Sequence, residues 1–360
     1  MNAPLITRRR FLATAAASAG ALVLRPAFTA AAATPPALSF FLIGVTHYFA
    51  DADAPDQLDS VSAQYNSRFV DLLNRLPGSA IPEAAGGGLV ASPKGVIHAG
   101  DLIHDGDKNG GAFPTMQKTE LAAYVADWGL TGTEGRLKYP VYEVFGNHDA
   151  PHGQHAILDP LAARARLRTD LTHLSANALH YSWDWGPIHF INLGITVGSD
   201  KREARPKKFD PLGSLEFLIE DLAANVGNSG RAVVITHHVN LGSVFKCDPA
   251  APNLTLNWDP CDLRAYWDAI KGANVVAMLY GHTHKRATFR WDGEKTTGPT
   301  GVPVFNTASA AHFDLKHHAF FYFEVTEREL VAREYATDNG LETAAWAPQV
   351  WRVPLEQRAA

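Results

Sequence analysis

Apolar runs of strand length alternate with amphipathic helical stretches through the first part of the chain. Strand-length runs occupy residues 38–45, 96–99 and 139–145. Between them, residues 56–76 carry apolar side chains at helical spacing and end at Pro77-Gly78, and residues 116–128 show a second helical pattern. This alternation predicts parallel strands joined by right-handed helical crossovers.

The pattern loosens after residue 150 and changes character near the end of the chain. We predict helices over 156–172, 214–226 and 262–271, and strands over 179–185, 188–193, 232–236 and 275–280. Short alternating strands follow at 288–291, 302–305, 320–325 and 330–335, as expected of an antiparallel sheet. We therefore place one domain over residues 34–340, with insertions near 151–212 and 241–261, and set residues 341–360 apart as a tail.

The first 33 residues have the pattern of an export signal. Three consecutive arginines, Arg8 to Arg10, precede an uncharged run from Phe11 to Leu24, which alanine-rich sequence follows. Paired arginines before Phe-Leu resemble the twin-arginine signal, whose export machinery carries proteins that are already folded. We therefore expect that machinery as a partner and a periplasmic or secreted destination.

The net charge argues against some partners. The 360 residues are 46% hydrophobic and 19% charged, as in ordinary globular domains. Because four arginines and no acid lie within residues 1–33, the formal charge of −5 becomes −9 for the remainder. So acidic a chain is a poor partner for nucleic acid, and no apolar run beyond the signal is long enough for a transmembrane helix.

Cys247 and Cys261 are the only cysteines. In an oxidising compartment they could form one disulfide across the second insertion, whereas their spacing does not match a zinc knuckle. Two free thiols are the alternative.

Histidine, aspartate or asparagine follows each of five predicted strands. Imidazole, carboxylate and amide groups are the ligands that divalent metals bind in hydrolytic sites. A carboxylate shared by two ions would hold them about 3.5–4 Å apart, a separation suited to a phosphoryl group, and Asp101 is our choice. We expect eight further histidines to be ordinary hydrogen-bonded residues: His98, His104, His173, His180, His189, His312, His317 and His318. His152 and His155 follow the central loop closely and are less favoured candidates for lining the cleft. The candidate ligands are His47, Asp101, Asn147, His237, His282 and His284.

The order of these motifs resembles the calcineurin-like metallophosphoesterase family. The matching segments are Gly100-Asp101, Gly146-Asn147-His148-Asp149, His237-His238 and Gly281-His282-Thr283-His284. The resemblance implies an α/β fold, a four-layer α-β-β-α sandwich of mixed sheets with an antiparallel C-terminal part.

The resemblance also assigns roles to these residues. One ion would be bound by Asp101, Asn147, His237 and His282, and the other by His47, Asp101 and His284. His148 would contact the phosphate and protonate the leaving oxygen, and Asp149 would orient His148.

One motif departs from the family pattern. The family's first motif is Asp-x-His, and this chain has Val45-Thr46-His47. Valine cannot bind a metal, so we expect the ion at His47 and His284 to be held more weakly, with Asp51 or Asp53 as less favoured substitutes. His104 stands where purple acid phosphatases have a tyrosine, so a tyrosinate-iron site is not expected. The metals implied are two divalent ions of manganese, iron or zinc.

We therefore predict an exported enzyme that hydrolyses phosphate mono- or diesters with a hydroxide held on the metal ions. Its substrate would be a phosphorylated small molecule or a phosphodiester. Two alternatives remain: a scaffold or binding protein whose metal site has decayed at Val45, and a hydrolase with one metal ion that acts on another ester or amide.

Overall fold

The computed structural model describes residues 38–150, 155–199, 201, 209–242, 247–248, 250 and 257–356. The export signal predicted at residues 1–33 lies outside this range. No helix among the described residues is long and apolar enough to span a bilayer.

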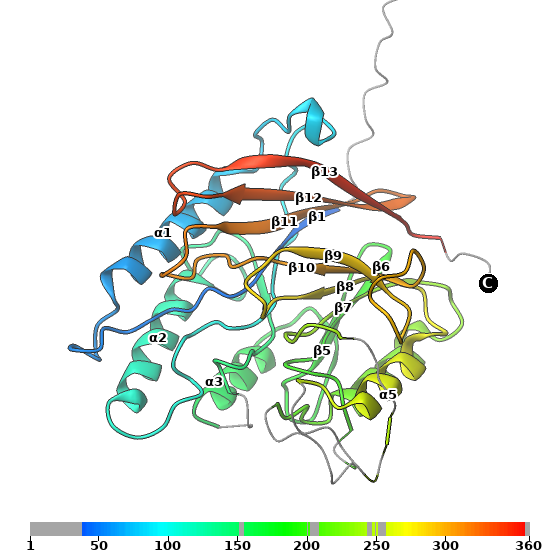
Figure 1. The fold of residues 1–360 in the computed structure, drawn as a ribbon, viewed down its shortest axis with the longest axis horizontal. Coiled ribbons are helices and arrows are strands. Elements are labelled where there is room, and N and C mark those ends of the chain that lie inside the picture. The colour runs from blue at the N-terminus through cyan, green and yellow to red at the C-terminus, as the bar shows by residue number, and fades with distance from the viewer. Residues whose placement is uncertain are drawn as a thin grey trace, which may run out of the picture. The chain divides into compact units, whose positions relative to one another are not determined.

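Two mixed β-sheets form the centre of the fold (Figure 1). In the six-stranded sheet the strands lie in the order β13 (Ala345–Pro354), β12 (Glu329–Thr337), β11 (His318–Val325), β1 (Leu38–Ile43), β2 (Val96–His98) and β3 (Val141–Glu143). In the seven-stranded sheet the order is β4 (Leu171–Leu174), β5 (Tyr181–Trp185), β6 (Ile188–Asn192), β7 (Ala232–Thr236), β8 (Val275–Tyr280), β10 (Val302–Asn306) and β9 (Ala287–Trp291).

Each sheet has a parallel part and an antiparallel part. Strands β1, β2 and β3 are parallel, as are β6, β7, β8 and β10. The antiparallel strands β11 to β13 extend the first sheet, and β4 and β5 extend the second. The predicted mixed sheets with an antiparallel C-terminal part are confirmed.

Helices cover the outer faces of the sheets. The helices are α1 (Ser60–Arg75), α2 (Phe113–Asp127), α3 (His155–Arg166), α4 (Ser214–Asp221) and α5 (Pro260–Ile270), with a 3₁₀ turn at Glu83–Ala85 and a π turn at Leu222–Val226. Helix α1 begins where the Asp59 carboxylate accepts hydrogen bonds from the N–H groups of Val61 and Ser62. Figure 1 shows α1 and α2 on the side of the first sheet and α5 on the side of the second.

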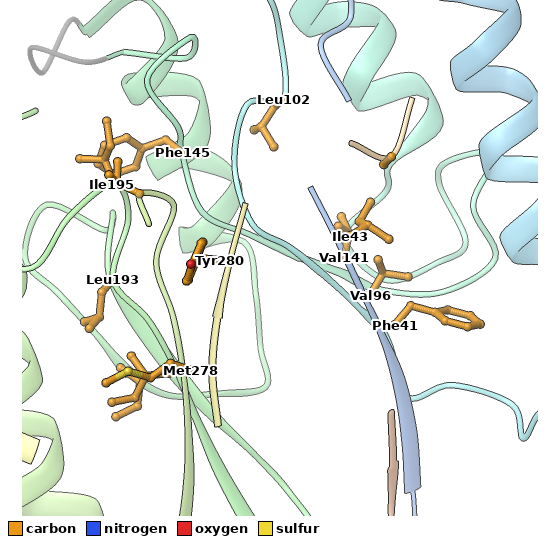
Figure 2. Packing of buried hydrophobic residues seen from close by; sticks show 14 of the residues in the cluster. Phe41, Ile43, Val96, Leu102, Val141, Phe145, Leu193, Ile195, Met278 and Tyr280 are labelled. Carbon is orange, nitrogen blue, oxygen red and sulfur yellow. The ribbon is translucent and has the colours of Figure 1, made fainter. Parts of the chain in front are cut away.

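Alternation along the strands produces the layers. In β1, Phe40 and Leu42 belong to the core between the sheets, whereas Phe41 and Ile43 belong to the core beneath the helices. Figure 2 shows Phe41 and Ile43 gathered with Val96 of β2 and Val141 of β3. These layers give the four-layer α-β-β-α sandwich expected from the sequence.

Two segments differ from the prediction. Residues 345–354, set apart as a tail, form strand β13, which pairs with β12 from Glu329↔Pro354 to Ala336↔Ala345. The helix predicted to run to residue 172 ends at Arg166, and β4 begins at Leu171 because it pairs with β5. In both cases pairing with a distant strand decides the conformation of a segment whose own pattern is weak.

Candidate metal centre

The predicted site residues lie in loops that follow parallel strands. The loop after β1 lies against the loop after β2, because the N–H groups of Val45 and Thr46 donate to the carbonyls of Gly100 and Asp101, at 2.8 and 3.0 Å. Carboxyl ends of parallel strands are the usual location of sites in α/β folds. Two groups of metal-binding side chains meet here and share Asp101.

The first group contains Asp101, Asn147, His238 and His282. Asn147 Oδ1 lies 3.0 Å from Nε2 of His238 and 2.7 Å from Nδ1 of His282, and Asp101 Oδ2 lies 3.2 Å from the same Nε2. His238 donates from Nδ1 to the carbonyl of Ala99 at 2.6 Å, so Nε2 is the nitrogen left for a metal. These four residues offer one carboxylate, one amide oxygen and two imidazoles.

The structure brings His238, and not the predicted His237, into this group. The His237 ring is fully buried and lies within 6 Å of the rings of Trp258, Tyr266 and Tyr280. Burial lowers its pKa to about 3. Both histidines follow the end of β7 at Thr236, and the His237 ring packs among these aromatic rings, whereas His238 contacts Asp101 and Asn147.

The second group contains His47, His284 and His312. One ring nitrogen of each lies within 4.8 Å of the others, and the His47 and His312 rings are 4.4 Å apart between centroids. Asp101 joins this group as well, because its Oδ2 lies 3.5 Å from Nε2 of His47. Asp101 Oδ2 thus lies close to a histidine of each group, as a shared ligand would.

His148 and His104 border the second group. The Nδ1 of His148 donates to the His104 carbonyl at 2.8 Å, and the His148 N–H donates to Asp101 Oδ1 at 2.9 Å. The His104 ring stacks on that of His148, and its Nδ1 lies 3.3 Å from Nδ1 of His47. The His148 side chain is 27% exposed, so a ligand from solvent can reach it.

Asp149 has a different set of partners from those expected. Its Oδ1 accepts hydrogen bonds from the N–H groups of Leu102 and Ile103, and its Oδ2 accepts one from Gly146. It therefore fixes the backbone of two site loops, while the carbonyl of the neighbouring loop orients His148.

Of the two proposed substitutes for Val45, Asp51 is engaged elsewhere and Asp53 is exposed. Asp51 Oδ1 accepts hydrogen bonds from the N–H groups of Asp53 and Ala54. Asp51 therefore stabilises its own turn.

Strained backbone is concentrated at the site. Eight described non-glycine residues have positive φ, and five belong to these loops: Val45, His47, Asp101, His282 and His284. Such conformations cost of order 1–3 kcal/mol each and often occur at functional sites. Gly146 is also required, because a Cβ there would lie 2.3 Å from Asp101 Oδ1.

Two buried side-chain atoms without a hydrogen bond indicate that the residues fit cations. The Nε2 of His47 and the Oδ2 of Asp101 are buried, and neither makes a hydrogen bond to a described residue. Burying such atoms without a partner costs free energy, which a metal ion between them would offset.

Burial and neighbouring charges keep most of these groups in the form that binds metal. Burial lowers the pKa of His47 well below its usual value, and that of His284 to about 4. Burial alone would raise the pKa of Asp101, but the neighbouring His238 lowers it well below the usual range. Burial alone would lower the pKa of His238, but Asp101 raises it above the usual value, so His238 must release a proton when it binds a metal. Neutral imidazoles and an ionised carboxylate are the species that bind metals.

Cys247 and Cys261 form a disulfide, the pairing considered from the sequence. Cys261 lies in the first turn of α5, where the Asp259 carboxylate accepts its N–H at 2.7 Å. The disulfide fixes one end of the second insertion to that helix.

Sequence reasoning missed three histidines at the site. His238 follows the predicted ligand His237 directly. The sequence pattern places both histidines after a predicted strand but does not indicate which of them faces the site. His104 lies three residues after the Gly100-Asp101 motif, and His312 lies six residues after the end of β10. An excess of histidine, 16 in 360 residues, was the available signal.

The chain belongs to the calcineurin-like phosphoesterase family. The model of that family matches residues 54–286, more than half of the chain. The match includes Asp101, Asn147, His238 and both histidines of the Gly281–His284 motif. Val45, His47 and His312 lie outside it.

Comparison with solved structures supports the same fold in one of the two cases below. A dimetal phosphatase from Danio rerio is 14% identical, with a TM-score of 0.55 over 89% of this chain and 100% of its own. Vps29 of Chaetomium thermophilum is 12% identical, with a TM-score of 0.38 over 89% of this chain and 98% of its own. The second likeness is too distant to carry an argument, and the first shows the fold alone. Among curated proteins, none matches.

Proposed function

We propose that this protein is a metal-dependent phosphoesterase with a two-cation centre. Asp101, Asn147, His238 and His282 would hold one cation, and His47, Asp101 and His284 would share in holding the second. The observation that carries the proposal is the position of Asp101 Oδ2, which is buried and lies 3.5 Å from Nε2 of His47 and 3.2 Å from Nε2 of His238. The family and the dimetal phosphatase fold support it.

When bound, two such cations lower the pKa of water and neutralise charge on a phosphate ester in the transition state. The chain's own residues supply orientation and a proton. His148 donates its Nδ1–H to the His104 carbonyl, which leaves Nε2 to exchange a proton with the substrate. Protonated there, His148 can donate to the oxygen of the departing alcohol.

The two alternatives from the sequence make different predictions about metal content. A scaffold with a decayed site would contain less than one ion per chain and show no turnover with added Mn²⁺. A hydrolase with one metal ion would contain one ion and act on esters without phosphorus.

Metal analysis combined with Asp101→Asn tests the proposal. We expect two ions per chain in the wild-type protein and turnover of a chromogenic phosphodiester or monoester. Asp101→Asn should lose both ions and at least about 10²-fold in kcat, because one carboxylate serves both groups. Asp71→Asn is the matched control, since Asp71 is exposed and pairs with Arg136 on the surface. Equal turnover by metal-free protein would refute the proposal.

We also propose that the protein is exported folded through the twin-arginine route, to the periplasm or beyond. Support comes from the arginines before Phe11-Leu12 and from the Cys247–Cys261 disulfide, which is typical of oxidising compartments. Replacing Arg8 and Arg9 by lysine should leave the protein in the cytoplasm, as fractionation and immunoblotting would show. Unchanged export of that variant would contradict this route.

A further inference from the structure

The second histidine group lacks the carboxylate that its family position would supply. Val45 stands at that position, is fully buried and has φ of 62°. A β-branched residue in this conformation is a genuine outlier. The cation at His47 and His284 therefore has one protein ligand fewer than the family pattern would give it.

His312 reaches this place from the segment that follows β10. Its ring centroid lies 4.4 Å from that of His47 and 5.0 Å from that of His284. It is 7% exposed, so solvent does not separate it from the group. One nitrogen from each of the three rings lies within 4.8 Å of the others, a spacing that a single cation can bridge.

The segment that carries His312 is attached to the backbone at Val45. The His312 N–H donates to Ser309 Oγ at 3.0 Å, and that hydroxyl donates to the Val45 carbonyl at 3.1 Å. The Ala310 N–H donates to the Gly44 carbonyl at 3.0 Å. These bonds fix His312 in register with the position where the carboxylate is missing.

Asp314 gives His312 the partner that metal-binding histidines commonly have. Its carboxylate pairs with Nδ1 of His312. A carboxylate that accepts the Nδ1–H holds the ring in one tautomer and leaves Nε2 as the metal-binding nitrogen. Packing alone would explain the stacking of His312 on Phe313, but it does not explain why His312 lies among His47 and His284.

We propose that His312, oriented by Asp314, replaces the missing carboxylate as a ligand of the second cation. This inference rests on the proposed function. The second cation would then be held by His47, His284, His312 and Asp101, which is three imidazoles and one carboxylate. Because imidazole suits zinc and iron(II) better than magnesium, this position should select the former ions.

Zinc titration of the full-length mature protein tests the proposal without measuring activity. The metal-free protein would be titrated with Zn²⁺ against a chromophoric chelator, and the number of sites and their affinities compared among variants. We expect two sites in the wild type. His312→Ala should weaken one of them at least about 100-fold and leave the other unchanged, because only the second group loses a ligand.

Two further variants keep the test valid if His312→Ala folds poorly. Asp314 is 64% exposed, so Asp314→Asn should fold, and it should weaken the same site by about 10–100-fold. Val45→Asp in the His312→Ala background should restore affinity, since aspartate supplies the carboxylate and adopts positive φ more readily than valine. The control is His317→Ala, because His317 is half exposed and pairs with Asp338 away from the site.

The possible results separate this inference from the proposed function. Two sites of unchanged affinity in both His312→Ala and Asp314→Asn would overturn the role of His312 and leave the two-cation centre standing. Failure of the wild type to bind Zn²⁺ at all would overturn the proposed function, and this inference with it. Equal weakening in His317→Ala would assign the effect to the stability of the segment and would also overturn the inference.

Discussion

Glu120 of α2 supports the loop that orients His148. It is fully buried, and its two oxygens accept hydrogen bonds from the N–H groups of Ala50, His104 and Asp105, at 3.0, 3.3 and 3.0 Å. Burial, reinforced by the neighbouring Asp105 carboxylate, raises the pKa of Glu120 to about 8, against 4.5 ordinarily. The side chain is therefore neutral in the folded protein near pH 7.

This pKa predicts how stability changes with pH. A raised pKa in the folded state contributes stability that is fully present below pH 4.5 and is lost as pH rises through about 8. The difference between the two pKa values corresponds to a loss of up to about 5 kcal/mol in the free energy of unfolding.

Glu120→Gln should be less stable than wild type at low pH and more stable than wild type at high pH. An amide cannot accept from all three N–H groups, so the variant should be less stable than wild type by about 1–3 kcal/mol at pH 5. Glutamine does not ionise, whereas wild type loses about 1.4 kcal/mol per pH unit between the two pKa values, so this deficit should shrink with rising pH and change sign between about pH 6 and pH 7. Glu120→Ala, which leaves three N–H groups without an acceptor, should cost at least about 3 kcal/mol at pH 5.

The assay is urea unfolding of the metal-free protein with its disulfide intact, at intervals from pH 5 to pH 9. Glu220→Gln is the control, because Glu220 is exposed on α4, and it should stay within about 0.5 kcal/mol of wild type throughout. A constant deficit of Glu120→Gln from pH 5 to pH 9 would show that Glu120 is ionised throughout and would refute the reasoning.

Three further predictions concern catalysis and stability. His148→Asn should lower kcat by about 10²–10³-fold and leave the metal content unchanged, which kinetics and metal analysis would measure. Loss of metal in this variant would mean that His148 is a ligand. Glu143→Ala should lower the free energy of unfolding by about 3–5 kcal/mol, because the side chains of Arg164 and Arg168 lose their carboxylate partner. Urea unfolding measures this loss, and a value below about 1 kcal/mol would mean that water solvates the two arginines. Replacing Cys247 and Cys261 by serine should cost about 3 kcal/mol, since 14 positions separate them, and reductant should then no longer affect thermal unfolding.

The sequence by itself determined the alternation of strands and helices and most candidates for the first cation group, and its resemblance to a known family supplied the four-layer sandwich. Strand-length apolar runs followed by Gly-Asp, Gly-Asn-His-Asp and Gly-His-Thr-His are local signals, and the carboxyl ends of parallel strands bring them together whatever the loops do. Asp101, Asn147 and His282 were found in this way. In the structure Asn147 Oδ1 lies 2.7 Å from Nδ1 of His282, and ligand atoms of Asp101 and His282 lie within 4.8 Å of each other.

Only the tertiary structure decided the rest of the site. The choice between His237 and His238 depends on which face of β7 meets the aromatic rings beneath α5, and residue order cannot specify that face. His312 lies beyond the end of β10 in a segment without a periodic pattern, and it reaches His47 because Ser309 and Ala310 bond to the backbone at residues 44 and 45. Contacts between residues more than 250 positions apart leave no mark on local sequence, so packing alone brings this histidine to the site.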